Sequence, residues 1–321
     1  MPELIIFVIS LAAIIKGADW LGEASVNVAK KLGMSQLLVG ATLVSIATTL
    51  PETAISFFAG LEGESGISFG TILGSPAANL GLIMGIILLF GKTYPSKGYF
   101  TRTLNIFIIL LTLVFIIGLG GSITPIAGWV LLFIAIVYLL LEFFVSKSEE
   151  GIVDQIETRF SDIKGFFNQS DGLKNVIYIF IGATLLAVSA KFLVDSATVI
   201  AFNLSIPTIV IAATVVALGT SIPELATAIH SSFKGRLALS VGNLAGASVL
   251  NLTMALGAGS IIHPIMVPKE ALIISVLALA VISILNLASV LSKIAKEKIG
   301  AALIVTSIIF ALVFISVEIQ T

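Results

Sequence analysis

The sequence of 321 residues contains no cysteine and only two histidines, His230 and His263. The absence of cysteine excludes disulfides, thiolate metal sites and cysteine nucleophiles. Two histidines cannot form a multi-histidine metal site within one chain. The sequence also lacks a Walker motif and any arrangement of Ser, His and Asp typical of nucleophilic catalysis. We therefore expect no enzyme activity, no bound nucleotide and no cofactor.

Charge is scarce as well. Charged residues make up 11% of the chain, whereas soluble domains average about 25%. Hydrophobic residues make up 58%, and the mean hydropathy is +1.15. So few charges cannot cover a water-soluble globule of this size, which excludes a cytosolic enzyme, a nucleic-acid-binding protein and a disordered chain. Unbroken apolar runs such as 106–117 also differ from the alternating pattern of outer-membrane barrels. The composition predicts an all-α polytopic protein in the lipid bilayer.

Glycine, proline and charge clusters divide the chain into candidate membrane spans, each of which needs about 20 mostly apolar residues. We predict ten transmembrane helices, over residues 3–29, 35–60, 67–90, 102–119, 123–145, 174–203, 207–232, 237–262, 267–291 and 299–318. Ten spans leave little sequence for loops, so we expect no catalytic domain outside the membrane.

Lysine and arginine indicate the orientation of these spans. With the N-terminus outside, only Lys269 falls in an outside loop, and Lys16 and Lys191 fall within spans. The other 14 of the 17 basic residues then lie in inside loops. Because inside loops carry an excess of Lys and Arg, we predict a multi-pass protein of the cell membrane with both termini extracytoplasmic.

The two halves of the chain resemble each other. Segment 41–54, ATLVSIATTLPETA, matches segment 213–226, ATVVALGTSIPELA, at an offset of 172 positions. The same offset pairs glycines and an asparagine of the next span with their counterparts: Gly70, Gly74, Asn79 and Gly85 with Gly242, Gly246, Asn251 and Gly257. Five spans, an odd number, separate equivalent positions, so the two copies must cross the membrane in opposite directions. The sequence therefore predicts two inverted five-helix repeats.

This repeat defines the expected organisation of the chain. The first five-helix repeat covers residues 1–145 and the second, inverted one covers residues 174–321. They are joined by a cytoplasmic linker, residues 146–173, whose apolar residues recur at helical spacing and predict an amphipathic surface helix. Inverted repeats are characteristic of secondary transporters. Water channels also contain them, so a channel or a scaffold stays open at this point.

Each copy places one glutamate, Glu52 or Glu224, in an otherwise apolar span. An ionisable group at mid-bilayer costs about 2.5–3.5 kcal/mol, so such groups normally face a cavity and carry out a function there. A proline precedes each glutamate, at Pro51 and Pro223, and removes one backbone donor from the helix. Carbonyl groups freed in this way at membrane depth need another partner, and a cation can supply it.

Further oxygen-bearing side chains cluster around the glutamates at helical spacing. They are Thr48, Thr49, Thr220 and Ser221 on the glutamate spans and Ser75, Asn79 and Asn251 on the following spans. An all-oxygen ligand set favours hard cations such as Ca²⁺ and Na⁺. Two carboxylates balance one divalent ion, and monovalent ions competing for the same charge provide a basis for exchange. The alternative is a buried glutamate pair that only hydrogen-bonds helices or carries protons.

These segments resemble a known family. ATLVSIATTLPE and ATVVALGTSIPE, with GTILGSPAANLG and GNLAGASVLNLT, are similar to the two α-repeats of the Ca²⁺/cation antiporter superfamily, sodium/calcium exchanger type. The resemblance covers 37–90 and 209–262. It implies a prokaryotic-like member without a regulatory domain, with five plus five helices and a monomeric transport unit. It also implies exchange of Ca²⁺ for Na⁺ by alternating access, with the first and sixth spans sliding across the core.

The resemblance also implies a ligand set. Glu52 and Glu224 would hold Ca²⁺ by their carboxylates, and the carbonyl groups of Ser45 and Ala217 would add backbone ligands. The remaining ligands would be the side chains of Thr48, Thr49, Ser75, Asn79, Thr220, Ser221 and Asn251.

Two positions depart from the patterns of this family, and a third distinguishes it from the proton-coupled branch. Ala247 stands where the second repeat would match Ser75, which removes a hydroxyl expected at a Na⁺ site, and Asn251 stands where some members carry Asp. Gly246 occupies the place of the acid in the GN-x-x-E pattern of proton-coupled members, which favours Na⁺ over H⁺. The alternatives are a proton-coupled antiporter of Ca²⁺ or another divalent cation, and a passive cation channel.

Overall fold

The computed structural model describes residues 2–31, 45–90, 97–149, 170–222, 224–225, 228, 237–291 and 296–319. The chain is predominantly helical. The helices of the first half are α1 (Pro2–Lys31), α3 (Ser45–Glu62), α4 (Ser65–Pro76), η2 (Ala77–Ile83), α5 (Met84–Phe90), α6 (Lys97–Gly118) and α7 (Pro125–Glu149). Those of the second half are α9 (Ser170–Leu204), α10 (Thr208–Ile211), η3 (Ala212–Val216), α11 (Ala217–Thr220), α13 (Leu237–Leu250), η4 (Asn251–Ala255), α14 (Leu256–Ser260), α15 (Lys269–Leu291) and α16 (Lys296–Glu318).

Eight segments of the described chain are long and apolar enough to cross a membrane. Each matches one of the ten spans expected from the sequence: Pro2–Ala24, Ser65–Phe90, Phe100–Gly118, Pro125–Phe144, Lys174–Leu204, Val241–Ser260, Lys269–Leu291 and Lys296–Glu318. The expectation of a polytopic helical membrane fold is therefore confirmed.

The other two expected spans, 35–60 and 207–232, are described only in part, as α3 and as the shorter apolar helix Thr208–Thr220. Ten spans and an inverted repeat accordingly stay predictions. Most of the linker 146–173, including its expected amphipathic helix, lies outside the described residues.

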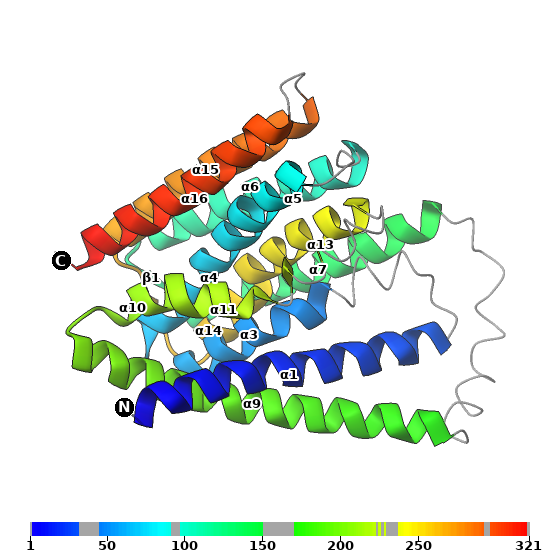
Figure 1. Ribbon diagram of the computed structural model, residues 1–321, viewed down its shortest axis with the longest axis horizontal. Helices are drawn as coiled ribbons and strands as arrows, with labels where there is room; N and C mark the ends of the chain where they lie inside the picture. Colours follow the sequence, from blue (N-terminus) through cyan, green and yellow to red (C-terminus); the bar gives the residue numbers. More distant parts are fainter. Residues whose placement is uncertain are drawn as a thin grey trace.

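The helices form two outer pairs around a central group (Figure 1). Helices α1 and α9 run side by side along one edge, and α15 and α16 run together along the opposite edge. The first pair is close because Gly17 and Gly182 face each other: a Cβ atom on Gly182 would lie 2.7 Å from the Gly17 carbonyl oxygen. Helices α3, α4, α11, α13 and α14 lie between the pairs, and both termini lie at the same end of the bundle.

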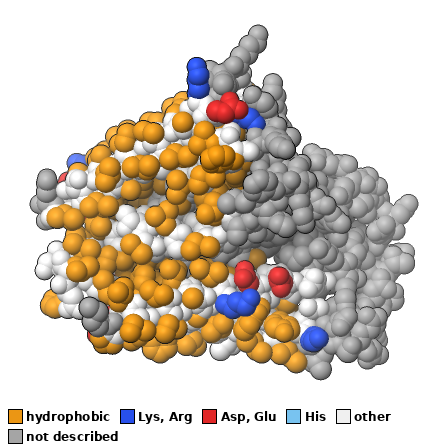
Figure 2. Space-filling model, in the orientation of Figure 1, with side chains coloured by type: hydrophobic (Ala, Val, Ile, Leu, Met, Phe, Trp, Pro, Cys, Tyr) orange, Lys and Arg blue, Asp and Glu red, His pale blue; other side chains and the backbone are white. Residues whose placement is uncertain are grey.

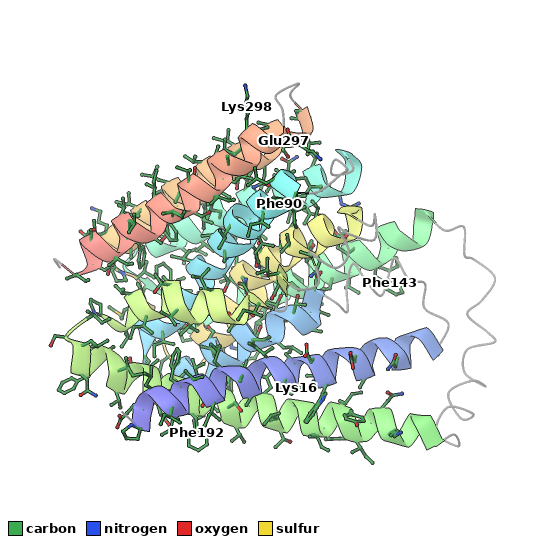
Figure 3. The ribbon with its side chains drawn as sticks, viewed as in Figure 1. Lys16, Phe90, Phe143, Phe192, Glu297 and Lys298 are labelled. Atoms are coloured by element: carbon green, nitrogen blue, oxygen red, sulfur yellow. The ribbon has the colours of Figure 1, made fainter. Side chains whose placement is uncertain are left out.

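Burial follows this arrangement. The spans Ser65–Phe90 and Val241–Ser260 are almost wholly buried, whereas the outer spans expose large apolar side chains such as Phe202 and Ile126. The described part of the face in Figure 2 is mostly hydrophobic, with charged side chains gathered in a few places. In Figure 3, Phe192 projects from α9 at the outer edge, and Glu297 and Lys298 lie at one end of α16. A surface this apolar fits a lipid environment.

A short antiparallel ladder joins two turns that are far apart in the sequence. Strand β1 (Ser122–Ile123) pairs with β2 (Ile265–Met266), with Ser122 opposite Met266 and Ile123 opposite Ile265. The Val267 N–H adds a bond of 2.9 Å to the Gly121 carbonyl oxygen. The turn between α6 and α7 is thus tied to the turn between α14 and α15.

Candidate cation-binding site

Glu52 lies in the middle of α3 and is completely buried. The hydroxyl of Ser75, on α4, donates to Glu52 Oε1 at 3.4 Å, and the Thr220 hydroxyl on α11 also contacts this carboxylate. Glu52 Oε2 is buried and has no hydrogen-bond partner among the described residues. One oxygen of the carboxylate is therefore left for another ligand.

Glu224 lies just beyond α11 and is also buried. The hydroxyl of Thr48 contacts its carboxylate, and the carboxylates of Glu52 and Glu224 are close enough to repel each other electrostatically. Each glutamate is thus contacted by a threonine from the other half of the chain, Thr220 or Thr48, and these threonines are related by the offset of 172. The structure brings the two acids expected from the sequence to one place.

The carbonyl groups of Ser45 and Ala217 both accept hydrogen bonds within their own helices. Thr49 Oγ1 donates to the Ser45 oxygen at 2.7 Å, and Thr48 Oγ1 does so at 3.4 Å. The Ala217 oxygen accepts the Ser221 N–H at 3.1 Å and the Thr220 hydroxyl at 3.3 Å. A hydroxyl that donates its proton to a carbonyl keeps its lone pairs free to accept, so these threonines remain able to bind a cation.

The two halves differ in how the helix runs at the glutamate. Helix α3 continues through Pro51 as far as Glu62. Helix α11 ends at Thr220, and Ser221 leaves the helical conformation with φ −81° and ψ 2°. Within the parts of these two spans that the structure describes, the interruption falls at Ser221 and has no counterpart in α3, while Pro223 lies outside the described residues.

The two asparagines expected at the site lie in π-helical turns. Asn79 is in η2, where the Met84 N–H bonds the Asn79 carbonyl five residues back, and Asn251 begins η4, where Leu256 bonds the Asn251 carbonyl in the same way. Both asparagines are buried. Single π-helical turns inside α-helices often mark functional sites.

Several polar atoms of the expected ligands are buried without a hydrogen-bond partner among the described residues. They are both amide atoms of Asn79, the Asn251 Oδ1 and the Ser221 Oγ. A buried polar group without a partner costs about 1–3 kcal/mol, so native proteins rarely retain one without a reason. The three oxygens of this set, from Asn79, Asn251 and Ser221, have the chemistry of a cation site beside the two acids.

Glycines let the helices of the two halves come into direct contact at this site. A Cβ atom on Gly74 would overlap the Ala213 carbonyl oxygen and lie 2.7 Å from the Ala217 Cβ. A Cβ atom on Gly246, the counterpart of Gly74, would lie 3.0 Å from the Ser45 Oγ. The absence of these two side chains brings the backbone near Ser45 and Ala217 against the facing spans.

Ala247 is buried and contributes no hydroxyl where the first half has Ser75. The adjacent Ser248 is buried too, but its hydroxyl donates to the Leu244 carbonyl of its own helix at 2.8 Å. Ser248 therefore does not replace the missing group, and the two halves of the site are unequal.

One polar contact was not among the sequence-based candidates. Asn243, on α13, accepts a hydrogen bond of 3.0 Å from the Ser45 Oγ through its Oδ1. Its position in GNLAG, within a glycine-rich buried span, is the signal that points to it. Among the described residues no three His, Cys, Asp or Glu side chains form a metal cluster, so the candidate site depends on two acids and neutral oxygens.

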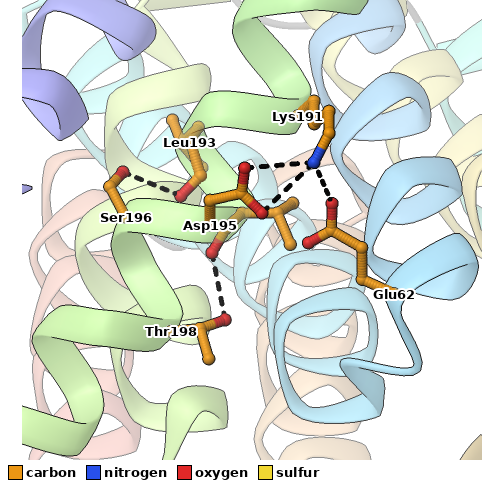
Figure 4. A network of polar contacts seen from close by, with 7 residues as sticks. Glu62, Lys191, Leu193, Asp195, Ser196 and Thr198 are labelled. Carbon is orange, nitrogen blue, oxygen red and sulfur yellow. Dashed lines mark hydrogen bonds and ion pairs between the residues drawn. The ribbon is translucent and has the colours of Figure 1, made fainter.

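Charged residues within α9 form a separate network (Figure 4). Lys191 Nζ lies 2.8 Å from Glu62 Oε1 and 3.1 Å from Asp195 Oδ2. The contact between Lys191 and Asp195 lies within α9, and the contact between Lys191 and Glu62 links α9 to the end of α3.

Comparison with known proteins places this geometry in a family. The family model described as "Sodium/calcium exchanger protein" matches residues 3–144 and 174–319. The chain is 28% identical over 263 residues to the inner membrane protein YrbG of Escherichia coli, covering 81% of this chain and 79% of that one. It is 27% identical over 313 residues to the sodium/calcium exchanger MaX1 of Methanosarcina acetivorans, covering 88% and 89%.

A solved structure agrees with these matches. The structure of the sodium-calcium exchanger NCX_Mj soaked with Na⁺ in the absence of Ca²⁺ superimposes with a TM-score of 0.66 at 25% identity, covering 96% of this chain and 97% of that one. The matched regions include both glutamates and every other residue of the candidate site. The chain belongs to the sodium/calcium exchanger protein family, within the Ca²⁺/cation antiporter superfamily.

Proposed function

We propose that this protein is a secondary-active antiporter that exchanges Ca²⁺ for Na⁺ at the site between Glu52 and Glu224. The observation that carries the proposal is that these two buried carboxylates lie close enough to interact electrostatically, each in contact with a threonine from the other half of the chain. Two like charges in an apolar interior repel each other, and a divalent cation between them removes that repulsion.

The proposed ligands for Ca²⁺ are the two carboxylates with hydroxyl, amide and carbonyl oxygens around them. Ca²⁺ takes six to eight oxygen ligands in flexible geometry, and the set offers that number. It comprises the side chains of Glu52, Glu224, Thr48, Thr49, Ser75, Asn79, Thr220, Ser221 and Asn251 and the carbonyl groups of Ser45 and Ala217. The unsatisfied oxygens of Glu52, Asn79, Asn251 and Ser221 support this assignment.

Exchange follows from competition for the same charge. Two carboxylates are neutralised by one Ca²⁺ or by two Na⁺, so occupancy by one ion disfavours the other. Transport then requires that the site open to one side of the membrane at a time. The inverted repeat proposed for the two halves, residues 1–145 and 174–321, would supply two alternative arrangements of this kind. The α1–α9 pair, packed across the central helices, is the proposed moving element.

Separate ion gradients test this proposal. Purified full-length protein is reconstituted in vesicles loaded with Na⁺, K⁺ or a low-pH buffer, and radioactive Ca²⁺ uptake is followed. We expect uptake only with an outward Na⁺ gradient. Uptake that follows the H⁺ gradient would replace Na⁺ coupling by proton coupling. Uptake that is indifferent to every gradient would identify a passive channel and contradict antiport.

A further inference from the structure

The π-helical segment η2, which carries Asn79, is held by polar side chains from two other helices. Asn286, on α15, donates through its Nδ2 to the Leu80 carbonyl oxygen at 2.8 Å. The Ser307 hydroxyl, on α16, lies 3.4 Å from the Ala77 carbonyl oxygen and shares its one proton with the Leu303 carbonyl of its own helix, which is nearer at 2.9 Å. Asn286 is completely buried. Neither side chain belongs to the candidate cation site, yet both contact the π-helical segment that contains Asn79.

Backbone chemistry explains why this turn needs outside donors. A π-helical turn bonds five residues back, as Met84 does to Asn79, and so leaves a carbonyl of the ordinary helical ladder without its usual partner. Buried carbonyl groups are nearly always hydrogen-bonded, and an unpaired one costs about 1–3 kcal/mol. In this segment Asn286 donates to the Leu80 carbonyl, and the Ser307 hydroxyl lies beside the Ala77 carbonyl.

The second half of the chain satisfies the corresponding carbonyl differently. Val249, the counterpart of Ala77, accepts its bond from the Thr253 hydroxyl of the same helix at 2.8 Å. Thr253 is the counterpart of Gly81, and a Cβ atom on Gly81 would overlap the Ser307 Oγ. The first half thus lacks a side chain where the second half carries its own donor, and Ser307 occupies the space.

The helices that pack against η2 and against η4 also differ in the polarity of the side chains at equivalent positions. At the offset of 172, the counterparts of Asn286 and Ser307 are Val114 on α6 and Ala135 on α7. Both are apolar and buried, and α6 and α7 pack against η4 as α15 and α16 pack against η2. Polar support from outer helices is therefore found for η2 and is replaced by apolar contacts at η4.

We propose that Asn286 and Ser307 are positioning residues that hold the π-helical turn η2 and thereby fix Asn79 for cation binding. This inference rests on the proposed function, since Asn79 is a proposed Ca²⁺ ligand. The side-chain amide of Asn79 has no hydrogen-bond partner among the described residues, so its placement depends on the backbone that carries it. Loss of either donor loosens that backbone.

Two substitutions with matched controls test the inference. Asn286→Leu removes the donor at similar volume, and Ser307→Ala is the milder change. The controls are Ser283→Ala on α15 and Thr306→Val on α16, whose hydroxyls donate to Leu279 and Ala302 of their own helices. Each full-length variant is reconstituted, and Na⁺-driven Ca²⁺ uptake gives the half-saturating Ca²⁺ concentration and the maximal rate. Thermal unfolding in detergent and hydrogen exchange of the η2 and η4 amides are measured alongside.

We expect Asn286→Leu to raise the half-saturating Ca²⁺ concentration about three- to tenfold and Ser307→Ala about two- to threefold. Amide exchange should accelerate in η2 and not in η4, and both controls should stay within about twofold of the wild type.

A lowered Tm with unchanged half-saturation would show a merely structural role and overturn the inference. If Asn286→Leu does not fold, Ser307→Ala still tests the inference. An unchanged half-saturating Ca²⁺ concentration in Ser307→Ala would then overturn the inference. A wild type without any gradient-driven uptake would remove the proposed function and this inference together. An active wild type with unaffected variants would remove this inference only.

Discussion

The hydroxyl of Ser75 on α4 donates a hydrogen bond of 3.4 Å to Oε1 of Glu52 on α3. The position that corresponds to Ser75 in the second half is Ala247, which is buried and can donate nothing. The two acids of the candidate site therefore lie in unequal surroundings, although the sequences around them are alike. This inequality bears directly on how many Na⁺ ions the site can hold.

Ser75→Ala is expected to weaken Na⁺ more than Ca²⁺. Na⁺ has only neutral oxygens and a share of a carboxylate to bind, so one lost hydroxyl is a larger part of its ligand set. The Na⁺ concentration that drives half-maximal Ca²⁺ exchange should rise about three- to tenfold. The matched control is Ser248→Ala, because the Ser248 hydroxyl bonds its own helix at Leu244. An unchanged Na⁺ dependence in Ser75→Ala would exclude this hydroxyl as a ligand.

Gly74→Ala should destabilise the protein although alanine is the better helix former. A Cβ atom there would lie 2.8 Å from the Ala213 Cα, which is backbone and cannot move aside freely. Overpacking of this kind costs about 1–3 kcal/mol and outweighs the gain in helix propensity.

The control for this change is Gly98→Ala on α6, where an added Cβ meets nothing within 4 Å. In thermal unfolding, Gly74→Ala should lower the Tm, and Gly98→Ala should leave it unchanged or raise it. A Gly74→Ala protein as stable as the wild type would refute the close approach of α4 to the chain around Ala213.

The predicted orientation can be read by cysteine labelling, because the chain has no cysteine of its own. His263 lies in the turn before β2, and Lys174 lies near the start of α9. Helix α9 starts at the end of the bundle opposite to the β1–β2 ladder (Figure 1). His263→Cys should react with a membrane-impermeant maleimide in intact cells, and Lys174→Cys only after permeabilisation. The reverse pattern would place both termini on the cytoplasmic side.

Much of the helical layout could be predicted from the sequence because apolar runs of membrane length are unmistakable. The sequence could single out Glu52 and Glu224 as candidates because acids are costly in lipid and these two recur at a fixed offset. In the structure, Thr48 and Thr220 each contact the acid of the other half, and the two carboxylates interact electrostatically. Their role as ligands stays a proposal.

The supporting contacts could not be predicted in the same way. Asn286 and Ser307 contact backbone carbonyl groups more than 200 positions away, and only the fold shows which carbonyl groups these side chains reach. Lys191 likewise donates a hydrogen bond to Glu62, which lies 129 positions away in the sequence. Contacts of this kind depend on helix packing, which periodicity and composition do not specify.

The most direct test of the central claim compares the wild type with Glu52→Gln and Glu224→Gln in vesicles carrying an outward Na⁺ gradient. Each change keeps the shape of the side chain and removes one of the two charges proposed to hold Ca²⁺. Loss of one partner from a buried charge interaction costs about 3–5 kcal/mol, so Na⁺-driven Ca²⁺ uptake should fall at least about a hundredfold. The folded protein should persist in thermal unfolding. Uptake at wild-type rate and affinity in either variant would contradict the account.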